Sequence, residues 1–220
     1  MKLNGSSQTA WRSFPVFALF ALALVAGRAE AAECEAPNLE LSQCTARCDR
    51  GDMVGCVNLA VIYTSGIGVE RNDVEAFRLL TLACERAEGK TRIHACATLG
   101  GMYASGRGTG KDYQQSLRLL GIGCDGGIPN ACANLGLHYA NGLGVTADQE
   151  KANALYLRAA RDFQRDCDAN RPSSCALLGG LYEFGQGVPR DLSIARSLFE
   201  KACRGGWKPA CARAAQVPSN

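Results

Sequence analysis

The stretch that decides the fold is CVNLAVIYTSGIGV at residues 56–69, because close copies of it return three times along the chain. The copies read CATLGGMYASGRGT at 96–109, CANLGLHYANGLGV at 132–145 and CALLGGLYEFGQGV at 175–188. The cysteines that open the copies, with Cys211 as the last of the series, are 40, 36, 43 and 36 residues apart. Such a period predicts an array built from one small helical or strand unit.

The shared residues of each copy fall at offsets 0, 3, 4 and 7 from its cysteine, and these offsets form one face of an α-helix. Offsets 3, 4 and 7 hold Leu, a small residue and Tyr: Leu59, Ala60 and Tyr63; Leu99, Gly100 and Tyr103; Leu135, Gly136 and Tyr139; Leu178, Gly179 and Tyr182. The small residue lets a neighbouring helix come close. The Gly-x-Gly that follows ends this first helix, because glycine adopts positive φ.

A second helix is predicted after each turn, starting at a capping residue: Asn72 or Asp73, Asp112, Asp148 and Asp191. The third repeat holds seven extra residues near 160–166. Seven residues are nearly two helical turns, so the second helix of that repeat can lengthen. The first repeat gains four residues between Cys84 and Cys96, which predicts one more turn or a longer loop containing His94.

The 12 cysteines form six pairs of sequence neighbours, and four of these pairs have seven residues between their members. The pairs are Cys34 with Cys44, Cys48 with Cys56, Cys84 with Cys96, Cys124 with Cys132, Cys167 with Cys175, and Cys203 with Cys211. An even count with this spacing favours disulfides in an oxidising compartment. Zinc is the less favoured alternative, since C-x2-C is absent, although Cys44 and Cys48 at i and i+4 could chelate on a helix. We expect no cofactor.

Residues 1–31 are predicted to be a signal peptide. The apolar run FPVFALFALALVA at 14–26 follows two basic residues, and a short A-E-A sequence ending at Ala31 provides a cleavage site. The run is shorter than the roughly 20 residues that a membrane span needs, so we expect no membrane span after cleavage. The remaining residues 32–220 are predicted to be an exported monomer, periplasmic or extracellular.

The recurring pattern A/C-x2-L-G-x2-Y-x2-G-x-G-V, then D-x3-A-x2-L-x3-A-C, closed by x7-C, resembles Sel-1-like repeats. The resemblance covers about residues 38–216 and is closest to the disulfide-stapled Helicobacter cysteine-rich proteins. It implies an all-α fold, a right-handed α/α solenoid related to tetratricopeptide arrays, in which each disulfide joins a second helix to the next first helix. The repeats would lie near 56–95, 96–131, 132–174 and 175–210, with partial caps at 38–55 and 211–220.

Composition and motifs narrow the function classes. A net charge of +3 without a run of Lys or Arg predicts no nucleic-acid partner. Some members of the cysteine-rich family are described as penicillin-binding or as weak β-lactamases, so a β-lactam-binding hydrolase is the alternative function that the resemblance implies. The S-x2-K motif of a serine β-lactamase is absent from the sequence, and the only histidines are His94 and His138. Catalysis is therefore left open.

The first helices of a solenoid stack along its concave wall, so their outward stripe is predicted to line a groove. Asparagine in this stripe can hydrogen-bond an extended peptide as donor and acceptor, and Leu177 and Phe184 can hold an apolar anchor. The candidate binding residues are Asn58, Ser65, Thr98, Ser105, Asn134, His138, Asn141 and Phe184. We predict a binding or scaffold module for a peptide, a protein or a cell-wall fragment; an ordinary solvated face is the alternative.

Overall fold

The computed structural model describes residues 34–35 and 38–218, so the predicted signal peptide at 1–31 lies outside the described residues. The described residues form ten helices and two short strands, β1 (Cys34–Glu35) and β2 (Asn38–Leu39), which pair antiparallel. The helices are α2 (Leu41–Asp49), α3 (Met53–Ser65), α4 (Asp73–Arg86), α5 (Gly89–Ser105), α6 (Tyr113–Asp125), α7 (Pro129–Asn141), α8 (Gln149–Asp168), α9 (Pro172–Phe184), α10 (Leu192–Arg204) and α11 (Lys208–Gln216).

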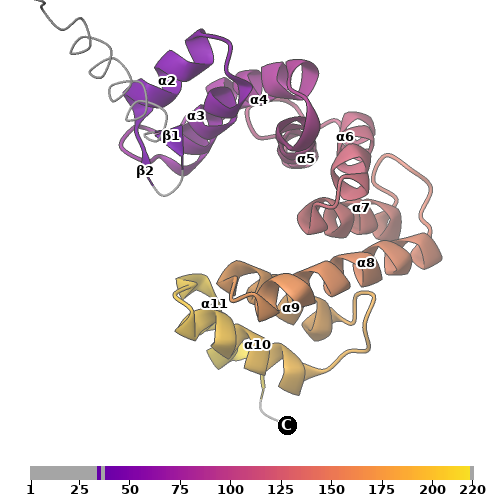
Figure 1. Ribbon diagram of the computed structural model, residues 1–220. Helices are drawn as coiled ribbons and strands as arrows, with labels where there is room; N and C mark the ends of the chain where they lie inside the picture. The colour runs from indigo at the N-terminus through magenta and orange to yellow at the C-terminus, as the bar shows by residue number, and fades with distance from the viewer. Residues whose placement is uncertain (1–33, 36–37, 219–220) are drawn as a thin grey trace, which may run out of the picture.

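Each helix packs against the next along the chain, from α2 to α11, which gives the predicted α/α solenoid (Figure 1). The first helices of the four repeats are α3, α5, α7 and α9, and the second helices are α4, α6, α8 and α10. Among the described helices, none is long and apolar enough to cross a membrane.

The second helices begin where the capping residues predict. The side chains of Asn72, Asp112, Asp148 and Asp191 each accept a hydrogen bond of 2.9–3.0 Å from the backbone N–H three residues later. In the first repeat the cap is Asn72, and Asp73 is the first helical residue. Each cap satisfies an N–H group that the helix itself leaves without a partner, which fixes the start of the helix.

The Gly-x-Gly turns end the first helices as predicted, with both glycines at positive φ in all four repeats. The second glycine also lets the turn lie against the preceding second helix. A Cβ at Gly108 would lie 2.1 Å from the Asp73 carbonyl oxygen, and one at Gly187 would lie 2.3 Å from the Leu157 nitrogen. At Gly68, in the first repeat, a Cβ meets nothing within 4 Å among the described residues.

All six predicted disulfides are present, and they include every cysteine of the chain. Three of them, starting at Cys84, Cys124 and Cys167, join a second helix to the next first helix. The bridge from Cys203 joins α10 to α11, and the bridge from Cys34 attaches β1 to α2. The repeats are therefore linked covalently at each junction, as the resemblance implies.

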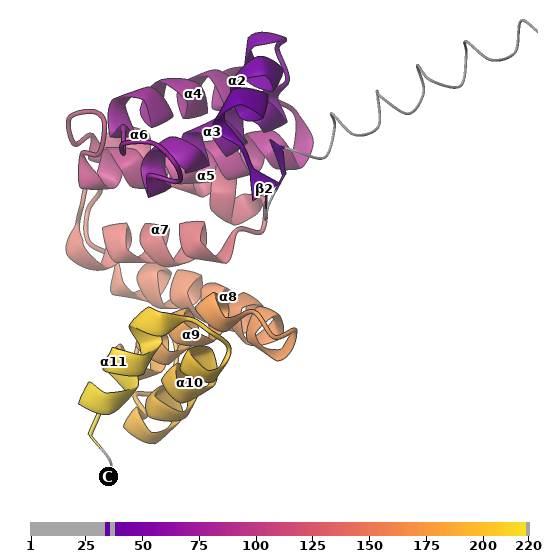
Figure 2. The ribbon, with the colours of Figure 1, turned by 90° about the vertical axis from the view of Figure 1, so that its left-hand side faces the viewer.

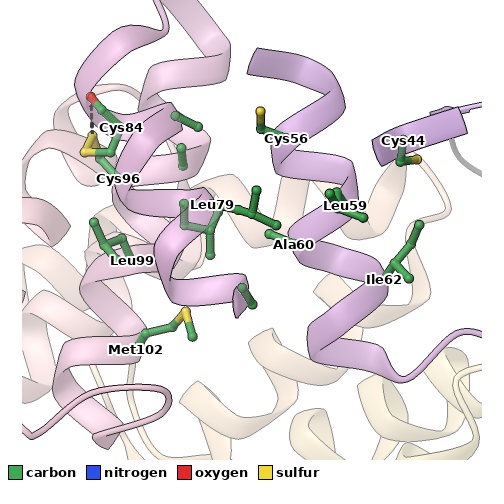
Figure 3. Packing of buried hydrophobic residues seen from close by; sticks show 14 of the residues in the cluster. Cys44, Cys56, Leu59, Ala60, Ile62, Leu79, Cys84, Cys96, Leu99 and Met102 are labelled. Carbon is green, nitrogen blue, oxygen red and sulfur yellow. Dashed lines mark hydrogen bonds between the residues drawn. A yellow bond between two sulfur atoms is a disulfide. The ribbon is translucent and has the colours of Figure 1, made fainter. Parts of the chain in front are cut away.

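The core follows the predicted helical stripe. Figure 3 shows Leu59 and Ala60 of α3 facing Leu79 of α4, with Leu99 and Met102 of α5 on the other side. All five of these side chains are buried. At the small-residue position, a Cβ on Gly100 would lie 3.0 Å from the Leu120 side chain, so Gly admits a close approach between α5 and α6.

The two insertions both lengthen helices. Helix α8 has 20 residues, where α6 and α10 have 13, as the seven extra residues predict. The four extra residues of the first repeat add one turn to the start of α5, which has 17 residues. His94 therefore lies within α5, and its predicted place in a loop is wrong: four residues are close to one helical turn, so the helix continues through them.

The insertion in α8 changes how the repeats stack. The turns at Gly108 and Gly144 lie against Asp73 and Tyr113, the first residues of α4 and α6. The turn at Gly187 instead lies against Tyr156 and Leu157 of α8, whose first residue is Gln149. That is a shift of seven residues, or about 10 Å along the helix.

This shift separates the first helices. Helix α3 contacts α5, and α5 contacts α7, whereas no comparable contact joins α7 to α9 in the described part of the chain. Figure 2 shows α2 to α7 stacked together, with α8 leading to a second group formed by α9, α10 and α11. The predicted single groove is thus interrupted after α7.

Candidate functional site

A cavity of about 750 Å³ lies along α5 and α7 and is closed at one side by the junction of α8 and α9. Its floor is apolar, because Ala97 and Met102 of α5 and Ala131 of α7 are buried beneath it. Its rim is polar and charged. Both the position and the mixed lining are typical of a site that binds a ligand rather than of a packing defect.

Three of the predicted binding residues, Thr98, Ser105 and Asn134, line this cavity. The hydroxyls of Thr98 and Ser105 donate hydrogen bonds of 2.9 Å to carbonyls of their own helix, so they offer only acceptor lone pairs to a ligand. Asn134 is exposed, and its side chain makes no hydrogen bond to any residue that the structure describes. Its amide can therefore both donate to and accept from a ligand.

Asn58, the residue of α3 that corresponds to Asn134 in the repeat pattern, is already engaged. Its Nδ2 donates a 2.6 Å hydrogen bond to the carbonyl of Cys34 in strand β1. The N-terminal strand thus lies over the start of the predicted groove, and Asn58 is half-buried beneath it and does not line the cavity. The prediction that Asn58 is open to a partner is wrong, because the sequence pattern of α3 contains no sign of the covering strand.

Ser65, Asn141 and Phe184 are exposed as predicted, but they do not line this cavity. The Asn141 side chain donates to the carbonyl of Leu137 one turn earlier in its own helix. Phe184 is 64% exposed at the end of α9, on the far side of the register shift in α8. It therefore cannot continue the surface formed by α5 and α7.

His138 is a correction to the prediction, because its side chain is only 1% exposed and faces the core. Its Nδ1 donates a 2.9 Å hydrogen bond to the Leu143 carbonyl, and its Nε2 lies 3.1 Å from the Ser116 hydroxyl. Ser116 is also fully buried and donates to the Gly100 carbonyl. This pair joins α5, α6 and α7 inside the molecule, and no substrate can reach it.

The repeat pattern itself contains the signal for this burial. His138 lies at offset 6 from its cysteine, where the other three repeats have Ile62, Met102 and Leu181, all of them buried. A position that is apolar in three repeats predicts a core residue in the fourth. Both ring nitrogens of His138 lie within hydrogen-bonding distance of a polar partner, which is the usual condition for burying a polar side chain.

The charged wall of the cavity was not predicted from the sequence. Lys90, Arg107, Arg165 and Arg171 line it, together with the single carboxylate of Asp166. Arg107 also forms an ion pair with Asp73, and Arg165 and Arg171 both form ion pairs with Asp166. Hydrogen bonds from Arg107 and from Arg71 hold the pKa of the Asp73 carboxyl far below its usual range.

Within the described residues, no group of three or more His, Cys, Asp or Glu side chains is placed to hold a metal ion. The buried Ser116–His138 pair is closed to solvent. The polar groups that do reach the cavity are the amides of Asn130 and Asn134, hydroxyls, the His94 imidazole, the Asp166 carboxylate and the cations. These groups bind ligands by hydrogen bonding and by charge.

Comparisons with known proteins agree with the repeat pattern. The family model described as Sel1 repeat matches four times, at residues 54–87, 93–128, 129–162 and 172–207, which is more than half of the chain. No curated protein sequence matches at a significant level.

Among solved structures, a Sel1 repeat protein from Oxalobacter formigenes is similar at 22% identity with a TM-score of 0.57, covering 82% of this chain and 70% of that protein. A protective antigen of uropathogenic Escherichia coli with an SLR fold is similar at 20% identity with a TM-score of 0.53, covering 88% of this chain and 50% of the antigen. Cysteine-rich protein B of Helicobacter pylori is 28% identical over 62% of this chain and 95% of its own, with a TM-score of 0.38.

Proposed function

Because the chain belongs to the Sel1 repeat family, we propose that it is an exported binding module whose cavity along α5 and α7 holds an extended peptide segment of another protein. The observation that carries this proposal is the hydrogen bond from Asn58 to the Cys34 carbonyl. An extended segment of the chain's own backbone lies at this position on α3. Asn134 has the same place in its repeat on α7 and makes no such bond to the described residues.

The geometry of the cavity suits such a segment. The amide of Asn134 offers the donor and acceptor that one residue of an extended backbone requires. The buried floor of Ala97, Met102 and Ala131 provides apolar contact for a side chain. The adjacent helices α3, α5 and α7 form a rigid wall, because disulfides link successive repeats. A preformed wall lowers the ordering cost of binding.

Export is supported by the disulfides. Six bridges that use all 12 cysteines are the pattern of a protein that folds in an oxidising compartment. The apolar run at 14–26 supports the same conclusion. Mass spectrometry of the protein purified from the producing cells tests it: we expect a chain that begins at residue 32 and contains six disulfides, and a reduced, uncleaved chain would contradict export.

A library of random 12-residue peptides, screened on the oxidised protein, tests the binding function. We expect a subset of peptides to bind, and Asn134→Ala to lower their affinity roughly 5- to 100-fold if both hydrogen bonds of the amide are lost. Asn141→Ala is the matched control, since it removes the same exposed amide from the same helix outside the cavity. Failure of every peptide to bind, or equal losses in the two variants, would overturn the proposal.

A further inference from the structure

Three of the four cations of the cavity lie in or next to the two insertions, whereas Arg107 belongs to the regular Gly-x-Gly turn of the second repeat. Lys90 belongs to the extra turn at the start of α5, and Arg165 and Asp166 belong to the seven extra residues of α8. Arg171 is the N-cap residue of α9, directly after the lengthened helix. Both insertions thus contribute charged side chains to the same cavity.

This local charge differs from that of the whole chain. The full sequence is almost balanced, with 24 basic and 21 acidic residues. The cavity is lined by four Lys or Arg side chains and one carboxylate. Even when the partners Asp73 and Asp162 are included, the cations outnumber the carboxylates. A cavity with this excess favours an occupant with negative charge.

The hydrogen bonds of the cations show which of them can still bind a carboxylate. Arg107 already uses Nε and Nη2 on Asp73, and Arg165 uses all three nitrogens on Asp162 and Asp166. Among the described residues, Arg171 instead contacts Asp166 through Nη1 alone, and its side chain is 67% exposed. The Nε and Nη2 edge of Arg171 therefore remains free for a bidentate contact.

Lys90 is the second available cation. It is exposed on the first turn of α5 and makes no ion pair with any residue in the described ranges. Asp166 keeps Arg171 in place, because its carboxylate is only 15% exposed and accepts from both Arg165 and Arg171. Arg171 is thus positioned before a ligand arrives, which lowers the entropy that binding costs.

Building on the proposed function, we infer that the occupant of the cavity is an acidic peptide segment. Its carboxylates contact Lys90 and the free edge of Arg171, and its backbone hydrogen-bonds Asn134. The cations select among peptides by the charge of their side chains, whereas the amide accepts any extended sequence.

Three random 12-residue peptide libraries test the inference on the oxidised protein: one rich in Asp and Glu, one rich in Lys and Arg, and one of uncharged residues. We expect the acidic library to bind most tightly and to weaken as salt rises. Lys90→Ala and Arg171→Ala are each expected to lower the affinity for acidic peptides about 3- to 10-fold. Arg171→Lys keeps the charge but loses the bidentate edge, so a smaller loss is expected.

Lys208→Ala is the matched control, because it removes the same charge from an exposed position at the start of α11, outside the cavity. Thermal unfolding of each variant checks that the fold is intact. If uncharged or basic peptides bind and depend on Asn134 but not on Lys90 or Arg171, the inference is wrong while the peptide-binding function stands. If Lys208→Ala weakens binding equally, the attraction is general and the inference also fails. If no library binds, both proposals fall.

Discussion

The two ends of the molecule are built from the same repeat but stack differently. In the N-terminal part, α3, α5 and α7 lie side by side and form one wall. In the C-terminal part, α9 is displaced along α8 and makes no comparable contact with α7. The predicted amide of Asn134 lies in the first part, where the cavity runs along α5 and α7 to the junction of α8 and α9, and the exposed Phe184 lies in the second.

The reason for the difference is the length of the insertion. Seven residues are close to two full turns, so both ends of α8 keep their inward faces toward their neighbours. Its N-terminal half packs on α7 in the usual register, with Tyr156 beside Gly136, and its C-terminal half still brings Cys167 to Cys175. An insertion of this length preserves each local contact and changes only the long-range arrangement.

Removal of the Tyr156 side chain, which contacts both the N-terminal and the C-terminal part, has the largest expected effect on stability. Tyr156 is 3% exposed and packs on Gly136 of α7 and on the turn at Gly187. Tyr156→Ala is expected to lower the free energy of unfolding by about 3–5 kcal/mol, because it leaves a cavity at the junction. The neighbouring Leu157→Ala, at an exposed side chain, is the control and should cost far less. Denaturant unfolding measures both, and similar losses would show that Tyr156 does not hold the junction.

Loss of the disulfide at the junction has the next largest effect. Replacing both Cys167 and Cys175 by Ala is expected to cost about 2.5 kcal/mol, the value for a closed loop of this length in the chain-entropy model. The bridge Cys203–Cys211 has the same sequence separation, but it lies at the end of the array. We expect removal of Cys203–Cys211 to loosen mainly α11, so calorimetry of that variant should show an early minor transition. Calorimetry of the variant without Cys167–Cys175 should show one broadened transition. The reverse pattern would contradict a junction that couples the two parts.

The glycines of the turns compare the parts directly, and the quantity of interest is the difference between variants, about 1–3 kcal/mol. Gly68, Gly108 and Gly187 share a φ of about 70°, so Ala at any of them carries the same backbone strain of roughly 1–2 kcal/mol. Only Gly108 and Gly187 press against a preceding helix, which adds about 1–3 kcal/mol of steric cost. Melting temperatures should therefore fall more for these two than for Gly68→Ala. Equal shifts in all three variants would mean that the turns do not hold neighbouring repeats.

The smallest expected effect is the pH dependence of the stability that the Arg107–Asp73 ion pair contributes. In the N-terminal part, Arg107 holds the α5 turn to Asp73, whereas the equivalent Gln186 contacts Tyr156 without a charge. Because hydrogen bonds from Arg107 and then Arg71 lower the pKa of Asp73 in the fold, the charged form stabilises the protein. That contribution is complete above the unfolded pKa of about 3.9 and is lost as pH falls toward the folded value. The difference in melting temperature between Asp73→Asn and the unchanged protein should therefore shrink below pH 4; a constant difference down to pH 2 would contradict the ion-pair explanation.

The local features of the fold could be predicted because the repeats show them four times. The caps, the positive-φ glycines and the disulfide partners each depend on residues a few positions apart. The covering of Asn58 by β1 could not be predicted, because Asn58 and Cys34 are 24 residues apart in the sequence and the repeat pattern describes only contacts between residues that are close in the chain. His138 was predictable from its buried equivalents in the other repeats.

In the candidate site too, the residues of the stripe that recurs in every repeat could be predicted and the others could not. Asn134, Thr98 and Ser105 belong to the repeating stripe, so the sequence could name them as candidates, and they line the cavity. Lys90 lies in the extra turn of α5, which the other repeats lack. Arg171 is the N-cap residue of α9, at a position that is Ile128 in α7 and Trp207 in α11, so periodicity does not predict a cation there. Their approach to one cavity depends on how much helix each insertion adds, and for the first insertion the sequence left open whether it forms a turn or a loop.

The most direct test of the account is an NMR titration of the oxidised, ¹⁵N-labelled protein with an acidic peptide selected from the library. The account predicts changes in amide chemical shift along α5 and α7 and around Arg171, with none in α9 from Leu177 to Phe184. That result would place the peptide in the cavity and show that the shift in α8 ends the groove. Changes that continue along α9 to Phe184 would contradict it, because one continuous groove would then cross both parts.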